Sequence, residues 1–458
     1  MKKTSLVMLA LCAGLPMMAQ APGSLTVTSA NGDSSFQFYG ILDLAVGKIA
    51  HSASFNDNYG NSADPRPLKY STTSVTGMIN GGISGDRFGF RGSTKISDDF
   101  KAIFTLESAI NLNSGQVTNA VQGLTLNSAG TAAAGPNMYS ADSSVSGQLF
   151  SRAAFFGVSS DTYGTLTAGR NTSFMLDLIP GYDPLNGAQM FTPIGYSGVY
   201  GGGGLTDDSR ADNSLKYRVK IGGLNLGALY KFGDTAGSSY SRTMVQLNAG
   251  YEMGPFGIQA AYEGAKDATS LSSDTIGTAA VPGSLKATFY DTTCYMLTAR
   301  YQLGALAIRA GYTHQEFTNP SEPQLDGQLT NIYGFSIGAW VTNPLNPASG
   351  YDQTKKFNVW WGGVNYDVTK QFNVAVGYYK AEQPSYAGTS GDYTAMGGQG
   401  DFGSLLLDYH FTSFFDVYLG YMGVQYKGAM AVAKNGTPPI PFDFASNHIT
   451  AIGMRYMF

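Results

Sequence analysis

The chain has 458 residues, of which 13% are charged and 13% are aromatic, with 59 glycines and a formal net charge of −4. Disordered chains are richer in charge and poorer in aromatic residues, and nucleic-acid-binding proteins are usually basic, so both classes are excluded. A helical membrane protein needs runs of about 20 apolar residues. The longest such run lies within the first 21 residues, so a large β-rich protein remains.

The N-terminus has the three parts of a secretory signal peptide. Lys2 and Lys3 precede an apolar stretch from Leu6 to Met18, and Ala19 and Ala21 provide the small residues of a cleavage site. Export with such a short signal indicates a bacterial envelope protein. The predicted division of the chain is a signal peptide at 1–21, an N-terminal lead-in segment at 22–35 and a folded barrel domain at 36–458.

Apolar and polar residues alternate in many segments of the remaining chain. The first of these segments carries Phe36, Leu42 and Val46 on one face and Gln37 and Asp43 on the other. This alternation is typical of a strand that lies between an apolar and an aqueous phase. Sixteen such strands are predicted, at 36–47, 84–94, 100–111, 150–159, 163–172, 212–221, 224–233, 243–253, 256–265, 288–302, 305–316, 355–366, 371–381, 401–411, 415–426 and 447–458.

The connections between these segments alternate in length. Short turns include Ser97–Asp99 and Gly254-Pro255. Because the short and long connections alternate, one end of the sheet has tight turns and the other has long loops, which is the pattern of a transmembrane β-barrel. The long connections are 48–83, 112–149, 173–211, 234–242, 266–287, 317–354, 382–400 and 427–446.

The two faces of the predicted strands have different chemistry. Charged residues such as Asp43, Arg87 and Glu107 fall on inward rows. Burial of unpaired charges in a dry core costs much free energy, whereas a water-filled lumen keeps them solvated. Sixteen strands enclose an aqueous channel, and closure pairs every backbone group within lipid. The prediction is an all-β, 16-stranded antiparallel transmembrane barrel. Tyrosines that suit a bilayer interface continue the outward rows: Tyr230, Tyr251, Tyr262, Tyr301, Tyr312, Tyr366, Tyr409, Tyr421 and Tyr456.

Six short sequence motifs occur along the chain, and their order and spacing are informative together. They lie at 38–43, 86–92, 101–108, 163–170, 210–217 and 452–458. Together they resemble the Gram-negative outer-membrane general porin family over the whole mature chain. The resemblance implies a homotrimer of barrels with long extracellular loops and short periplasmic turns, surrounded by outer-membrane lipid and lipopolysaccharide. The terminal Phe458 resembles the signal that the barrel-assembly machinery reads.

The resemblance also implies a pore constriction. In this family the third loop, here 173–211, folds into the barrel and sets acidic residues against a basic wall. The implied acidic residues are Asp183, nearest to the constriction, and Asp177. The implied basic residues are Arg91, Arg152 and Arg170, with Lys216 and Arg218 as further candidates, and Asp43, Arg87 and Glu107 are the other candidate lumen charges.

The leading functional hypothesis is a general diffusion porin that passes ions and small hydrophilic solutes down their gradients. Opposite charges across a narrow pore would create a transverse field that orients water and dipolar solutes. A channel selective for sugars or anions and a structural or adhesive surface barrel are the alternatives. Ion selectivity stays open, because loss of two lysines with the signal peptide takes the net charge from −4 to −6 while the lumen is rich in arginine.

Other chemistry finds little support in the sequence. The four histidines are scattered and no spacing marks a nucleophile, so an enzyme is not expected. No cysteine pair or close histidine pair indicates zinc. We therefore expect no metal, no cofactor and no nucleic-acid partner.

Overall fold

The computed structural model describes most of the barrel wall and part of the loops. The described ranges are 25–51, 75–113, 115–118, 149–194, 210–233, 237–268, 290–322, 354–385, 397–428 and 445–458, with short paired strands between some of them. The predicted signal peptide lies outside the described residues. Among the described helices, none has the length and apolar character needed to cross a membrane.

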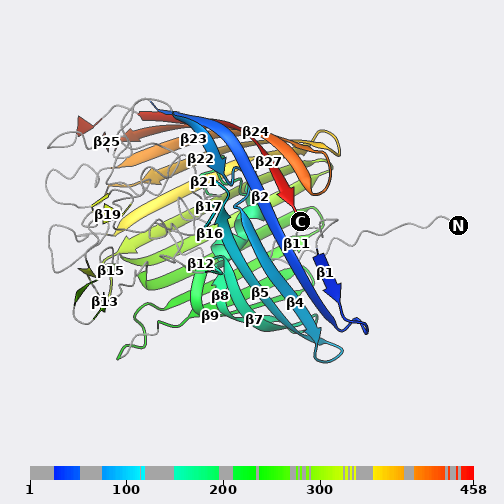
Figure 1. The fold of residues 1–458 in the computed structure, drawn as a ribbon. Helices are drawn as coiled ribbons and strands as arrows, with labels where there is room; N and C mark the ends of the chain where they lie inside the picture. The colour runs from blue at the N-terminus through cyan, green and yellow to red at the C-terminus, as the bar shows by residue number, and fades with distance from the viewer. Residues whose placement is uncertain are drawn as a thin grey trace.

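Within these ranges, sixteen long strands form one antiparallel wall (Figure 1). Each overlaps a segment that alternation predicts, so the predicted strand number is confirmed. The strands are β2 (Ser34–His51), β4 (Arg87–Lys95), β5 (Phe100–Asn111), β7 (Ala153–Ser160), β8 (Gly164–Thr172), β9 (Arg210–Ile221), β10 (Leu224–Lys231), β11 (Met244–Met253), β12 (Phe256–Ala268), β16 (Tyr290–Leu303), β17 (Leu306–Thr318), β21 (Lys355–Asp367), β22 (Phe372–Gln383), β23 (Gly398–His410), β24 (Phe415–Gly428) and β27 (Ala445–Met457).

Shorter elements accompany this wall. A single α-helix, α1 (Phe174–Tyr182), follows β8 among the described residues. Two short strands pair with wall strands, β3 (Val75–Asn80) with β2 and β6 (Gln116–Thr118) with β5. Four small antiparallel pairs lie in the long connections: β13 (Thr275–Ile276) with β14 (Ala279–Ala280), β15 (Leu285–Ala287) with β18 (Leu325–Gly327), β19 (Asn331–Ile332) with β20 (Phe335–Ser336), and β25 (Val432–Ala433) with β26 (Ile440–Pro441).

The barrel closes where the first and last wall strands meet. β2 and β27 lie side by side in Figure 1, and their register runs from Ile41 opposite Met457 to His51 opposite Asn447. Beyond the end of β27, the short strand β1 (Leu25–Thr28) pairs with the start of β2. The predicted lead-in segment therefore contains a strand that continues the pairing of β2 past the C-terminus. Closure leaves no long unpaired edge within lipid.

The C-terminal residue completes this seam. Gly40 donates a backbone hydrogen bond to Phe458 at 2.9 Å and accepts one from it at 3.1 Å. The Phe458 ring covers Gly40, where a Cβ would overlap it, and lies 5.4 Å from the Phe38 ring and 5.8 Å from the Tyr456 ring. The side chain thus packs over the junction between β2 and β27.

Replacing Phe458 with alanine is expected to lower the yield and heat resistance of the folded barrel. The change removes ring packing and leaves a gap over Gly40, a cost of about 1–3 kcal/mol for a half-buried ring. Gel mobility of unheated and heated protein measures the folded fraction. The matched control is Phe411→Ala, because Phe411 is 61% exposed. Equal losses in both variants would show that the seam has no special role.

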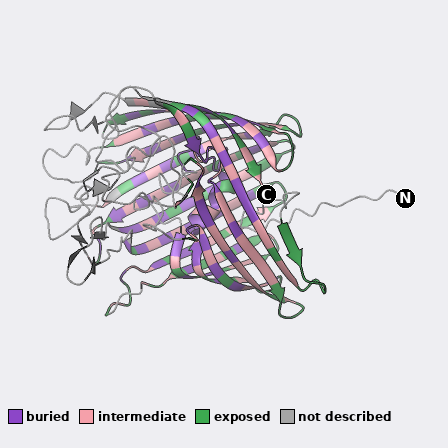
Figure 2. Cartoon of the chain, in the orientation of Figure 1, coloured by how far each residue is buried: buried purple, intermediate pink, exposed green. Residues whose placement is uncertain are grey.

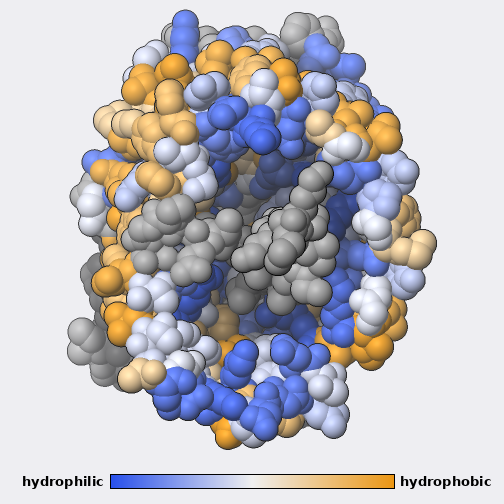
Figure 3. Space-filling model, turned by 90° about the vertical axis from the view of Figure 1, so that its right-hand side faces the viewer, coloured by the Kyte–Doolittle hydropathy of each residue, from blue (hydrophilic) through white to orange (hydrophobic). Residues whose placement is uncertain are grey.

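The wall strands alternate between two environments (Figure 2). In β11, Leu247 is 52% exposed on the outside whereas Gln246, one residue earlier, is fully buried inside. Viewed from the short-turn end, hydrophobic residues surround the outside of the barrel and hydrophilic residues surround the central opening (Figure 3). Of the tyrosines predicted to face outward, the exposed ones are Tyr230, Tyr251, Tyr301, Tyr366, Tyr409, Tyr421 and Tyr456.

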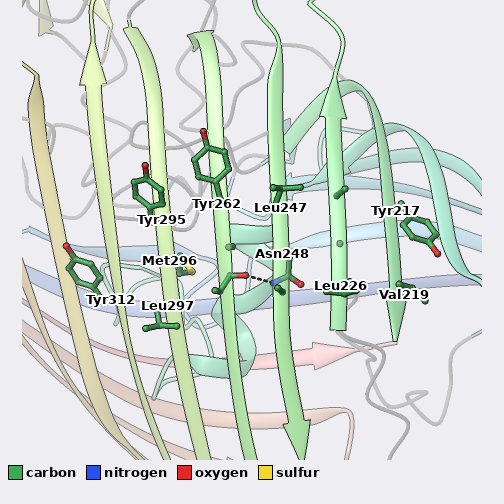
Figure 4. Close-up of a pocket in the computed structure, with 15 residues that line it drawn as sticks. Tyr217, Val219, Leu226, Leu247, Asn248, Tyr262, Tyr295, Met296, Leu297 and Tyr312 are labelled. Carbon is green, nitrogen blue, oxygen red and sulfur yellow. Dashed lines mark hydrogen bonds between the residues drawn. The ribbon is translucent and has the colours of Figure 1, made fainter. Parts of the chain in front are cut away.

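One stretch of the outer surface shows this tyrosine row in detail (Figure 4). Tyr262, Tyr295 and Tyr312 stand on the neighbouring strands β12, β16 and β17, with the first two rings 5.5 Å apart. Next to them, Ala249 pairs with Ala260, so small side chains leave a shallow apolar groove of about 700 Å³. An apolar surface bordered by tyrosine is suited to contact with lipid near its polar boundary.

Candidate pore constriction

The described part of the third long loop, 173–194, lies inside the barrel. Ser173 caps α1, and its hydroxyl accepts a hydrogen bond from the Leu176 backbone at 3.1 Å. The helix contacts β11, β12, β16 and β17. Its buried side chains are Phe174, Met175, Leu178, Ile179 and Tyr182. Because these apolar residues pack against the wall, the loop stays inside the lumen without a covalent link.

Glycines in the wall allow the loop to lie close to it. A Cβ at Gly227 on β10 would overlap the Phe174 ring, and a Cβ at Gly420 on β24 would overlap the Phe191 ring. Between these two points, Trp361 donates a hydrogen bond to the Tyr182 carbonyl at 3.1 Å. The loop therefore follows the inner wall from β10 to β24 and leaves the space beside β2, β4, β5 and β7 open.

This open space is a cavity of about 320 Å³ with an excess of positive charge. Among the described residues that line it, five are arginines and two are acids. The arginines come from β4, β9, β27 and the segment before β7, and the acids come from β5 and α1. The charged lining residues are Arg87, Arg91, Arg152, Arg210, Arg455, Glu107 and Asp177.

Glu107 is neutralised by neighbours on the same wall. Its carboxylate accepts a hydrogen bond from Tyr39 at 2.8 Å and from Arg152 at 2.6 Å, and Arg87 lies 3.9 Å away. Arg91 has a different environment. It donates to the neutral side chain of Gln37 at 2.5 Å and lies 4.9 Å above the Tyr39 ring. The charge of Arg91 therefore stays available to the cavity.

Asp177 is held by bases of the adjacent wall. It accepts a hydrogen bond from Thr172 at 2.7 Å, forms an ion pair with Lys216 and lies 3.8 Å from Arg218. Only 7% of its side chain is exposed. The structure thus brings these three predicted charges together, but as direct pairs at one edge of the cavity rather than as opposed sides of a pore.

The structure places the Asp183 carboxylate away from the cavity, between loop and wall, which differs from the position that the resemblance implied. Asp183 is fully buried. It accepts hydrogen bonds from Tyr379 at 2.6 Å and Thr192 at 3.2 Å, and from the backbone of Leu185 at 3.0 Å and Gly187 at 2.8 Å. This carboxylate closes the turn after α1 and ties it to β22.

Arg170 also lies outside the cavity lining. It is buried, donates to the Ser151 carbonyl at 2.6 Å and forms an ion pair with Asp212. Its guanidinium therefore joins strand ends within the wall. Arg210 and Arg455 line the cavity instead. The inward row of the last strand already contains Arg455, but the position of Arg210 at the start of β9 follows only from the path of the loop.

The second wall strand is divided into β3 and β4, and the inward break between them supports the loop from the other side. β3 pairs with one half of β2 and β4 with the other, and residues 81–86 between them leave the ladder. The Asp43 carboxylate accepts backbone hydrogen bonds from Ile83 at 2.9 Å and Ser84 at 2.7 Å. The Met190 backbone donates to the Gly82 carbonyl at 2.9 Å. Asp43 is thus a positioning residue for this break and, through it, for the loop.

One group of side chains has the composition of a metal site. Donor atoms of Asp408, His410 and Asp416 lie within 4.8 Å of one another near the short-turn end. The Arg455 guanidinium lies 2.7 Å from Asp416 and 3.9 Å from Asp408. Because this fixed cation already balances the carboxylates, we assign no metal to the group.

Comparison with known proteins places this architecture in a family. The family model for the Gram-negative porin matches residues 6–402. An outer membrane porin protein of Bordetella pertussis is 29% identical over 237 residues, which is 51% of this chain and 48% of the relative. The chain thus matches about half the length of this curated relative.

Solved structures share the fold. An anion-selective porin from Comamonas acidovorans has a TM-score of 0.58 at 17% identity, over 93% of this chain and 100% of that chain. The outer-membrane expressed OmpT of Vibrio cholerae has a TM-score of 0.54 at 17% identity, over 95% of this chain and 100% of that chain. Since the family model covers most of the sequence and the barrel agrees with it, the chain belongs to the Gram-negative porin family and is a protein of the outer membrane.

Proposed function

We propose that this porin is a passive diffusion channel for ions and small hydrophilic solutes and that it favours anions. The observation that carries this proposal is that more arginines than acidic residues line the cavity and that one of them, Arg91, has the neutral Gln37 as its hydrogen-bond partner. Between low-dielectric walls, a fixed charge attracts counter-ions more strongly than it does on an open surface. The structurally similar Comamonas porin is described as anion-selective, but the proposal rests on the arginines of this chain.

The lining also weighs against two of the alternatives, a sugar-selective channel and an adhesive surface barrel. Tyr39 and Phe155 are the aromatic residues in the described lining, and Arg91 covers the Tyr39 ring, so there is no aromatic ladder along which a sugar could slide. An open cavity beside the loop is not needed in an adhesive barrel. Transport through it requires no covalent step, and we propose no catalytic role for the lining residues.

Purified protein in planar lipid bilayers tests the proposal. We expect stepwise single-channel currents. Across a KCl gradient, we expect a reversal potential that is shifted from zero toward the equilibrium potential of chloride, which is called the chloride side below. Absence of steps in concentrated salt would contradict a channel. A reversal potential on the potassium side would contradict the preference for anions.

The outer surface supports a homotrimer as the assembled form. On β2 and β4 the outward aromatics are phenylalanines, with Phe36 stacked 5.7 Å from Phe90 and Phe38 5.3 Å from Phe90. Phenylalanine has no hydroxyl for the bilayer boundary and is suited to burial against another protein surface. We assign this face to subunit contacts, the tyrosine-bearing face to lipid and lipopolysaccharide, and Phe458 to recognition by the barrel-assembly machinery.

Light scattering of the detergent-solubilised protein tests the assembly. We expect a protein mass of three chains. A mass of one chain at the concentrations used for bilayer recording would contradict the trimer and leave the channel proposal unaffected.

A further inference from the structure

The loop side of the cavity combines an apolar surface of α1 with the polar residues Asn186 and Gln189. Leu176 and Pro180 are four residues apart on α1, so they lie on one face of the helix, and both line the cavity. Ile83, from the inward break of the second wall strand, also lines it. Asp177 lies beside Leu176 in sequence, but its carboxylate is held by Lys216.

The opposite side of the same cavity is basic. Arg91 and Arg87 project from β4, and Arg152 lies next to them across Glu107. Arg91 has the neutral Gln37 as its hydrogen-bond partner in the described part of the chain. A guanidinium in this position can donate two parallel hydrogen bonds to a carboxylate. The cavity therefore has a carboxylate-binding side at Arg91 and an apolar side, formed by Leu176, Pro180 and Ile83, that gains by excluding water.

We propose that the cavity binds organic anions that carry one carboxylate and a compact apolar body, such as aromatic or branched-chain carboxylates. This inference rests on the proposed anion-favouring channel and names a solute class for it. The carboxylate meets Arg91, and the body lies against Leu176, Pro180 and Ile83. A volume of about 320 Å³ is at the lower end of the range for small-molecule sites, which suits a single ring or branched chain.

Other solute classes fit this lining less well. A hydrated inorganic anion can use the arginines, but it leaves the apolar side without a partner. A neutral apolar solute can use Leu176 and Pro180, but it must displace water from the guanidinium groups without replacing their hydrogen bonds. An anion with an apolar body satisfies both sides at once.

Block of the chloride current by three small solutes tests this inference on the wild-type channel. Benzoate carries both the charge and the ring, acetate carries the charge, and benzamide carries the ring. We expect saturable block by benzoate at concentrations about tenfold lower than acetate requires, which corresponds to burial of roughly 60 Å² of apolar surface. Benzamide is expected to leave the current unchanged.

A matched pair of variants locates the effect. Leu176→Gln is expected to reduce the advantage of benzoate over acetate to about twofold or less. Leu303→Gln is the control, because Leu303 is 60% exposed at a short turn and lies outside the cavity lining. Its advantage for benzoate should equal that of the wild type. If both variants lose it equally, the apolar side of this cavity is not the binding surface.

The reversal potential of the same wild-type channels separates the two proposals. A chloride-side potential with equal block by benzoate and acetate overturns the organic-anion site and leaves the anion-favouring channel intact. A potassium-side potential overturns the channel proposal and the organic-anion site together.

Discussion

Changing Arg91 to glutamate is expected to shift the reversal potential of the channel toward potassium and to lower the chloride-to-potassium permeability ratio roughly tenfold. The substitution reverses a charge in the cavity lining, where the partner of Arg91 is the neutral Gln37. At an effective dielectric constant of about 20, one unit charge changes the energy of an ion roughly 7 Å away by about 2 kcal/mol. Two charge units, partly screened by salt, support a shift of this size.

The matched control is Lys95→Glu, which makes the same charge change four residues later on the same strand and inward row. Lys95 lies at the short-turn end, has 44% of its side chain exposed and pairs with Asp98 at 2.8 Å. Solvent screens such a group, so its effect on selectivity should be small. Equal shifts in both variants would show that total charge controls selectivity. An unchanged potential in Arg91→Glu would show that ions avoid the cavity.

The barrel wall could be predicted from the sequence because its signals are local. The alternation of apolar and polar residues in each strand can be read from consecutive residues. The length of each connection can likewise be read from the chain itself. Two features of the wall depend on distant segments and were not predicted. β27 pairs with β2 only from Ile41 onward, and β1 forms by pairing with the same edge of β2 before that point. The break at 81–86 depends on the Asp43 carboxylate, which accepts its backbone N–H groups.

The charges of the wall strands were more predictable than those around the loop. Arg87, Arg91 and Glu107 lie on inward rows, so strand alternation alone directs them into the lumen, and all three line the cavity. The position of Asp183 depends instead on Tyr379, a residue 196 positions away along the chain. No local pattern encodes that contact, and resemblance to a family supplies only an average position for the loop.

Lys216 shows the same limit from the side of the wall. Alternation correctly directs it inward on β9, but its role depends on α1, which places Asp177 against it. A residue predicted to be a basic pore residue therefore forms an internal ion pair, and only 3% of its side chain is exposed. The apolar lining by Leu176 and Pro180 also follows from the orientation of α1, since their sequence pattern alone would equally suit burial against the wall.

Replacing Asp183 with alanine is expected to produce larger and noisier single-channel currents. The variant leaves two hydroxyl groups and two backbone N–H groups without their buried acceptor. Each buried polar group left unpaired costs about 1–3 kcal/mol. The total loss of free energy is therefore larger than the apolar contacts of a short loop segment readily offset. The turn after α1 should then leave the wall part of the time, and each departure should widen the pore.

The control is Asp161→Ala, which removes a carboxylate from the exposed short turn between β7 and β8 and should leave current amplitude and noise unchanged. The reversal potential decides between two roles for Asp183. If the carboxylate only positions the loop, the preference for chloride should weaken, because the arginines then face a wider and better-hydrated pore. If the carboxylate itself faces the ions, its removal should strengthen the preference for chloride without a change in current amplitude. That second result would mean that the pore-facing acid is Asp183 and that its bond to Tyr379 is not maintained in the conducting channel.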